Sequence, residues 1–146
     1  MGIAFPDGTF LLRGPVQGHQ NDIGILRETR LETELPTLFG NWAIGGDGAF
    51  PVSTNVLSVK LWLEGHMAVG SREFCACRVA VEWLFAEMTN TFRWLNLKEG
   101  QKVALTNPSI IYQCAALLAL ARTSLYGNKI SDYFGLNPPS LSEIFV

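Results

Sequence analysis

The sequence predicts an α/β chain in which helices pack on a short sheet. Two short β segments come first, at residues 3–5 and 9–13, and Pro6-Asp7-Gly8 between them is typical of a turn. A helical pattern and a compact apolar run at 42–44 follow, and the second half of the chain shows mostly helical spacing of its apolar residues. This order of elements fits a layer of helices over strands.

The length of 146 residues suggests one domain, or one large piece of a domain, over residues 1–146. The chain is 48% hydrophobic and 16% charged, whereas about a quarter of residues are charged in a usual soluble domain. We therefore expect an ample core and some apolar surface that a partner would cover. The net charge of −2 argues against a stand-alone DNA-binding module, but acidic metal ligands in a nuclease core would also lower the charge.

The N-terminal half predicts two short helices and a buried strand. Asn21 or Asp22 is expected to cap a helix that begins near Ile23, and a second helix is expected over 31–38. The run at 42–44 reads as a buried strand that ends in a flexible loop, Gly45-Gly46-Asp47-Gly48. Residues 57–63 alternate like a strand, although a helix stays open as an alternative.

The C-terminal half predicts two longer helices and a tail. Apolar residues recur at three- and four-residue steps over 78–95, which indicates an amphipathic helix. Thr106-Asn107-Pro108 is a typical helix start, and that helix is expected to stop at Gly127. Its apolar residues lie nearly all round, so we expect it to be buried on more than one side. Residues 127–146 are predicted to form an extended tail.

The cysteines and histidines argue against a zinc site, and the apolar runs argue against a membrane span. The odd set Cys75, Cys77 and Cys114 indicates a reducing compartment and buried or incidental thiols rather than a zinc knuckle. His19 and His66 are not paired by spacing and are expected to be solvated. The most apolar run, 110–125, is short for a membrane span, so no membrane association is expected.

Two acidic residues are candidates for a metal site. Asp47 is expected at the end of a strand, where ligand-binding residues of α/β sheets tend to lie. Glu82 lies on the amphipathic helix beside apolar residues. If folding brings the two carboxylates together, a divalent cation would neutralise them. Each also has an ordinary alternative: Asp47 as a turn residue, and Glu82 as the ion-pair partner of Arg78 one helical turn earlier.

Several motifs resemble those of DDE superfamily endonucleases of the Harbinger type. Residues 46–51, Gly-Asp-Gly-Ala-Phe-Pro, resemble that family's G-D-x-A-Y-P motif. Residues 78–85, Arg-Val-Ala-Val-Glu-Trp-Leu-Phe, resemble its R-V-x-V-E-W-x-F helix. Further similarity is found, in the family's order, at 5–8, 14–22, 125–131 and 133–139.

The resemblance implies a partial RNase H-like fold that lacks its first strand or strands. It implies metal-dependent cleavage and strand transfer of transposon DNA, with Mg²⁺ or Mn²⁺ as cofactor. In those roles Asp47 would be the second metal-binding aspartate and Glu82 the final glutamate, while Asp22 and Arg78 are candidates for lining the site. The family also implies DNA as substrate, a Myb-like DNA-binding protein or a transposase-like subunit as partner, and residence in the nucleus.

The chain departs from the family pattern at informative positions. No residue matches the family's first catalytic aspartate, and Asp7 is expected to be a turn residue rather than its substitute. The family's His-Asp pair is Asn21-Asp22 here, its tyrosine is Phe50, and Ala86 replaces a glycine. We therefore expect a truncated remnant with weak nuclease activity or none. The alternative is a non-catalytic interaction module or the product of a decaying transposon gene.

Overall fold

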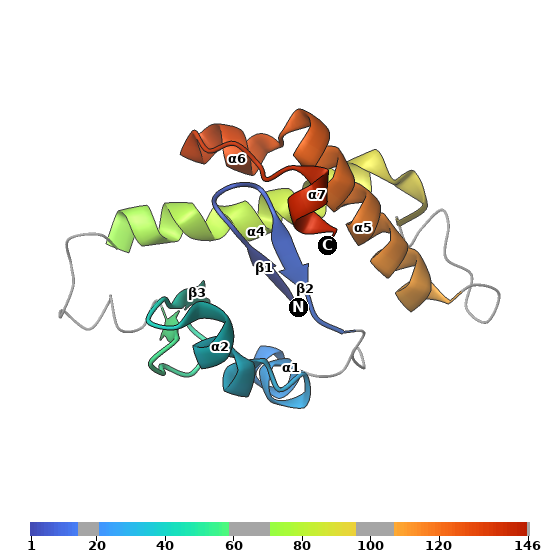
Figure 1. Cartoon of the computed structure of the whole chain (residues 1–146). Helices are drawn as coiled ribbons and strands as arrows, with labels where there is room; N and C mark the ends of the chain where they lie inside the picture. The colour runs from blue at the N-terminus through green and yellow to red at the C-terminus, as the bar shows by residue number, and fades with distance from the viewer. Residues whose placement is uncertain (15–20, 59–70, 96–106, 146) are drawn as a thin grey trace. The chain divides into compact units, whose positions relative to one another are not determined.

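The computed structural model describes residues 1–14, 21–58, 71–95 and 107–145, which form a mixed α/β chain (Figure 1). The chain divides into two compact units. The first comprises Met1 and residues 13–79, and the second comprises residues 2–12 and 80–146. The division arises because the chain leaves the second unit after its first two strands and returns to it within a long helix.

Besides the first residues of a longer helix, the first unit contains two short helices. α1 spans Asp22–Glu28 and α2 spans Leu31–Phe39, close to the predicted ranges. The side chain of Asn21 accepts a hydrogen bond from the backbone N–H of Gly24 at 2.8 Å, which makes Asn21 the cap and leaves Asp22 in the first turn. The fully buried apolar side chains of this unit are Leu26, Leu31, Leu35 and Val56.

The strands of the first unit form a parallel pair. β3 spans Ile44–Gly46 and β4 spans Val56–Ser58, and Ile44 lies opposite Val56. The predicted strand at 42–44 is thus displaced toward the glycines, and the prediction that it is buried is wrong for Trp42, which is 80% exposed. The predicted strand at 57–63 is confirmed for its first two residues, and the rest lies outside the described residues.

Two strands begin the second unit as an antiparallel hairpin. β1 spans Gly2–Ala4 and β2 spans Phe10–Leu12, as the sequence predicts. In the turn, the Asp7 carboxylate accepts hydrogen bonds from the backbone N–H and the hydroxyl of Thr9 at 2.9 and 2.6 Å. Gly8 follows with φ of +87°, a conformation that favours glycine. The turn role of Asp7 is therefore confirmed.

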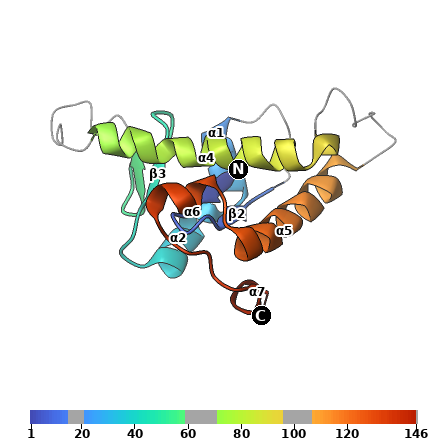
Figure 2. The same ribbon diagram turned by 90° about the horizontal axis from the view of Figure 1, so that it is seen from above.

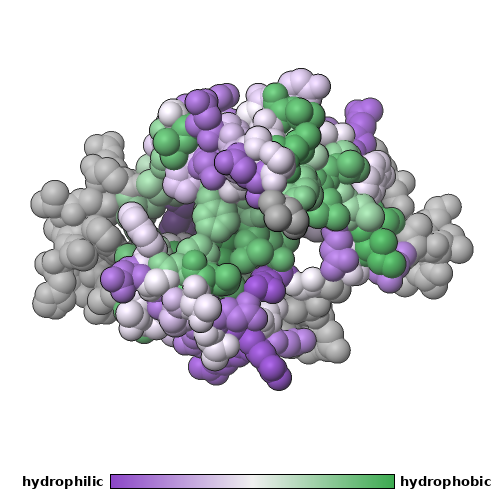
Figure 3. All heavy atoms as spheres, in the orientation of Figure 1, coloured by the Kyte–Doolittle hydropathy of each residue, from purple (hydrophilic) through white to green (hydrophobic). Residues whose placement is uncertain are grey.

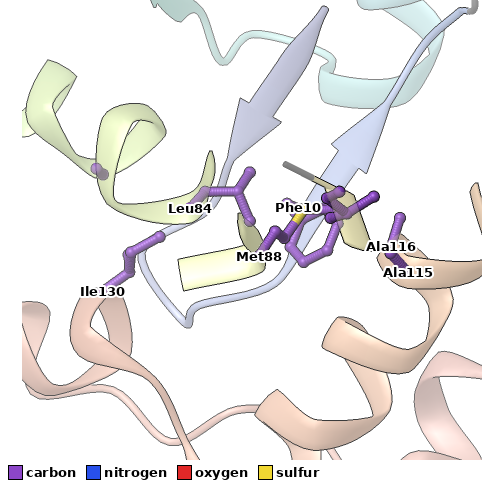
Figure 4. Close-up of a cluster of buried hydrophobic side chains, with 8 residues drawn as sticks. Phe10, Leu84, Met88, Ala115, Ala116 and Ile130 are labelled. Atoms are coloured by element: carbon purple, nitrogen blue, oxygen red, sulfur yellow. The ribbon is translucent and has the colours of Figure 1, made fainter. Parts of the chain in front are cut away.

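Helices α4 and α5 supply most of the core of the second unit. Figures 1 and 2 show these two helices from two sides. α4 spans Ser71–Thr91, begins earlier than predicted and is followed by the 3₁₀ helix η1, Arg93–Leu95. α5 spans Pro108–Tyr126 and ends at Gly127, as predicted, with Asn107 as its cap. The buried core side chains come from β2, α4, η1, α5 and α6 (Lys129–Phe134): Phe10, Ala80, Leu84, Met88, Leu95, Ala115, Ala116 and Ile130. Figure 4 shows part of this cluster.

Residues 127–146 contain two short helices where the sequence predicted an extended tail. α6 spans Lys129–Phe134 and α7 spans Leu141–Ile144. Each has a capping box, in which the cap residue and the residue three positions later satisfy each other's backbone N–H groups. In α7 the hydrogen bonds from the Ser140 hydroxyl and backbone hold the pKa of Glu143 below its ordinary value. The two prolines, Pro138 and Pro139, lie outside both helices and so interrupt neither.

Asn128 joins the two ends of the second unit. Its side-chain oxygen accepts hydrogen bonds from the N–H groups of Ile130 and Ser131 and so caps α6. Its side-chain N–H₂ donates to the carbonyl of Gly8 at 2.8 Å and to the hydroxyl of Thr123 at 3.1 Å. A Cβ at Gly8 would lie 2.4 Å from the Asn128 amide oxygen, so the hairpin turn needs glycine for close approach as well as for its φ.

We predict that Asn128→Ala lowers the free energy of unfolding by about 2–3 kcal/mol, because it removes a helix cap and leaves buried polar groups unsatisfied. Urea unfolding followed by circular dichroism measures this loss. Asn107→Ala is the matched control: it removes an exposed cap with one hydrogen bond, and about 1 kcal/mol is expected. Equal losses in the two variants would contradict the joining role of Asn128.

Candidate functional site

Asp47 lies directly after β3, at the carboxyl end of the parallel strand pair. The prediction that it ends a strand is therefore confirmed. Its backbone carbonyl accepts a hydrogen bond from the hydroxyl of Ser58 at 3.2 Å and from the N–H of Phe50 at 2.9 Å. These bonds tie Asp47 to the end of β4 and close the turn after it. The local fold thus holds the backbone of Asp47 at a position where α/β sheets commonly bind ligands.

The glycines before Asp47 are required by aromatic rings. A Cβ at Gly45 would lie 2.8 Å from the ring of Phe74, and a Cβ at Gly46 would lie 2.9 Å from the ring of Phe50. Both distances are too short for a side chain. The sequence suggested that these glycines make a flexible loop, but they belong to β3 and allow the two rings to approach its backbone.

The carboxylate of Asp47 faces a guanidinium group. Arg78 Nη2 lies 3.6 Å from Asp47 Oδ1, and both side chains belong to the first unit. The Asp47 side chain is 61% exposed and that of Arg78 is 34% exposed. Asp47 also accepts a hydrogen bond from the N–H of Gly48. An exposed ion pair of this kind contributes little to stability. It does place the positive charge of Arg78 beside the Asp47 carboxylate, the candidate metal-binding group.

Glu82 lies on α4, one helical turn after Arg78, and is exposed. Within the described residues it forms no ion pair, and Arg78 is paired with Asp47 instead. The structure therefore does not contain the helix-surface ion pair between Arg78 and Glu82 that was the alternative prediction. Asp47 belongs to the first unit and Glu82 to the second, so their convergence on one cation stays a prediction.

The remaining candidate residues have ordinary positions. Asp22 lies exposed in the first turn of α1, where a negative charge interacts favourably with the helix dipole. His19 and His66 lie outside the described residues. The sequence predicted buried or incidental thiols, and the structure excludes the buried alternative, because Cys75, Cys77 and Cys114 are exposed and free.

Asn55 is a buried polar residue that the sequence analysis did not single out. Its side-chain N–H₂ donates to the carbonyls of Gly40 and Trp42, at 2.8 and 2.7 Å, and the residue is only 4% exposed. It therefore holds the backbone that enters β3, in place of a neighbouring strand. The sequence feature that could have indicated this role is the position of Asn55, a polar residue directly before the strand β4.

Among the described residues, no cluster of three or more histidine, cysteine, aspartate or glutamate side chains could hold a metal ion. Asp47 offers hard carboxylate oxygens of the kind that Mg²⁺ prefers, open to solvent.

Comparison with protein-family models, curated proteins and solved structures gives no match for this chain. What the described residues define is a mixed α/β protein with two small two-stranded sheets. None of the described helices is both long and apolar enough to cross a membrane.

We predict that Asp47→Asn changes the free energy of unfolding by less than about 1 kcal/mol, because the pair with Arg78 is exposed. Asn55→Ala, in the same unit, should cost about 2 kcal/mol, because two carbonyls lose a buried donor. Native-state hydrogen exchange of the amides of β3 and β4 compares the two variants. A loss at Asp47 as large as that at Asn55 would mean that the carboxylate serves the fold.

Proposed function

We propose that this chain is a remnant of a metal-dependent DNA endonuclease of the Harbinger DDE type, and that it is weak or inactive alone. The observation that carries the proposal is the position of Asp47: a solvent-open carboxylate directly after a strand of a parallel pair. The motif that contains it, and the helical motif that contains Glu82, are the two that the resemblance assigns to metal ligands.

The proposed chemistry is phosphodiester cleavage. When bound, Mg²⁺ or Mn²⁺ would supply an activated water and neutralise the charge that develops on the phosphate. Asp47 and Glu82 would hold the cation through carboxylate oxygens. Arg78, which lies against Asp47, would be released from that carboxylate by the cation and could then contact a phosphate oxygen of the DNA.

Weak activity follows from the number of ligands. No residue of this chain matches the family's first aspartate, so only two of the three metal-binding carboxylates are assigned. With two carboxylates in place of three, the chain would hold a cation weakly and would supply less of the charge neutralisation that two-metal phosphodiester cleavage requires. The same resemblance suggests DNA as substrate, a Myb-like protein or a transposase-like subunit as partner, and a nuclear location.

A second candidate function is a non-catalytic interaction module. The observation that favours it is the set of large apolar side chains that α5 exposes to solvent. Exposed apolar surface of this kind marks contact sites for other proteins. The two candidates differ in whether Asp47 and Glu82 matter for anything that the chain does.

We predict weak binding of Mn²⁺, with a dissociation constant on the order of 1 mM or higher. Electron paramagnetic resonance of free Mn²⁺ measures it. Asp47→Asn and Glu82→Gln should each weaken binding, because each removes a carboxylate ligand. Asp132→Asn is the matched control, since Asp132 is an exposed carboxylate on α6 outside the proposed site. If all three variants bind Mn²⁺ as the unaltered chain does, the metal site proposed at Asp47 and Glu82 is wrong.

We also predict that the chain alone nicks supercoiled plasmid DNA at or near background in Mg²⁺ or Mn²⁺, because two carboxylates would hold the cation only weakly. Agarose gels of the relaxed and supercoiled forms measure the rate. Robust nicking that disappears in both Asp47→Ala and Glu82→Ala would refute the prediction of weak activity and would show a complete active site. Nicking that persists in both variants would indicate a contaminating nuclease.

A further inference from the structure

The sequence predicted that α5 is buried on more than one side, and this prediction is wrong for the structure. One face packs into the core through Ala115, Ala116 and Thr123. The opposite face is open: Ile110, Leu117, Leu118 and Leu125 are between 55% and 60% exposed. Figure 3 shows apolar side chains gathered over this helix. A helix that is apolar all round is normally covered all round.

The exposed side chains form one continuous stripe. At 100° per residue, they fall within an arc of about 100°. Residues 114, 118, 121 and 125 alternate steps of four and three, the spacing by which two helices pack along a seam. We call this set the outer stripe: Ile110, Cys114, Leu117, Leu118, Ala121 and Leu125.

Charge indicates what kind of partner fits the outer stripe. The structure describes all of α5, and its one charged residue is Arg122, which borders the stripe. Arg122 is already satisfied, because its Nη1 donates to Glu87 Oε1 of α4 at 2.7 Å. A charged partner therefore finds no counter-charge on the stripe. A second copy offers an identical uncharged surface and meets no like-charge repulsion.

We infer that the outer stripe is the contact surface for a second copy of this chain, with the two α5 helices antiparallel across a two-fold axis. The axis lies at the middle of the stripe, so Ile110 faces the partner's Leu125 and Cys114 faces the partner's Ala121. Leu117 and Leu118 then form the centre of the contact. Antiparallel pairing also sets the two helix dipoles in opposite directions, which is favourable.

The area of the stripe sets the strength of the pair. Its four large side chains expose on the order of 400 Å² on each copy. With the flanking residues, the pair buries on the order of 1,000 Å² in total, which is the lower end for a specific interface. We therefore expect a dimer that dissociates in the micromolar range. This inference does not rest on the proposed metal site, so Asp47→Asn and Glu82→Gln should leave the dimer unchanged.

The first test measures mass in solution by light scattering after size exclusion, at several protein concentrations. The unaltered chain should approach twice its mass of 16.1 kDa as concentration rises. Leu118→Asp should weaken the dimer at least about a hundredfold, because the charge enters the contact twice. Leu38→Asp is the matched control, since Leu38 on α2 is 52% exposed against 55% for Leu118. A monomer at high concentration, or equal effects of the two variants, would overturn the inference.

The second test measures the pairing by disulfide formation. In a Cys75→Ser, Cys77→Ser background, Ala121→Cys should give a rapidly oxidised dimer through Cys114 of the partner copy. The same background without Ala121→Cys should oxidise slowly, because the two Cys114 side chains are separated along the antiparallel helices. Leu38→Cys in this background controls for random collisions. If Ala121→Cys forms no more dimer than Leu38→Cys does, the antiparallel arrangement is wrong.

Discussion

The buried side-chain amide of Asn128 is the constraint on which the second unit depends. It caps α6, donates a hydrogen bond to the hydroxyl of Thr123 near the end of α5, and donates another to the carbonyl of Gly8 in the N-terminal hairpin. That last bond joins residues 120 positions apart. Loop closure over such a length carries an entropic cost, and the buried apolar cluster between the hairpin and the helices supplies the compensating free energy. The contact between the hairpin and the helices therefore has two sources. The hydrogen bond from Asn128 to Gly8 fixes its geometry, and the buried apolar cluster supplies its stability.

Much of the fold could be predicted because local chemistry determines it. The Pro-Asp-Gly turn, the cap at Asn21, and the helix from Pro108 to the glycine at 127 each depend on residues within a few positions of one another. The failures lie where distant residues decide. The apolar run around Trp42 predicted a buried side chain. In the structure, the amide of Asn55 binds the backbone carbonyl of Trp42, and the indole is exposed to solvent. Gly45 was predicted to be flexible, but the ring of Phe74, which is distant in sequence, lies where a Cβ at this position would be.

The candidate site divides in the same way. The position of Asp47 after a strand follows from a short apolar run and the glycines beside it, so the sequence was sufficient to predict it. Its ionic partner was not predictable, because Arg78 has an equally good local partner in Glu82, one turn away on the same helix. Only the tertiary fold selects between the two. The convergence of Asp47 and Glu82 depends on how two units are arranged, and no local pattern encodes that arrangement.

The order in which the two units occur along the chain has a consequence for synthesis on the ribosome. The first unit is almost continuous in sequence and has emerged once residue 79 has left the exit tunnel. The hairpin of the second unit is made earlier but must wait for Asn128. At usual elongation rates that wait is on the order of 10 s. Until α4 has been made, the two nascent strands lack the helices of their own unit that cover them. In that part of the interval they depend on chaperones, or on their own short length, to avoid pairing with other chains.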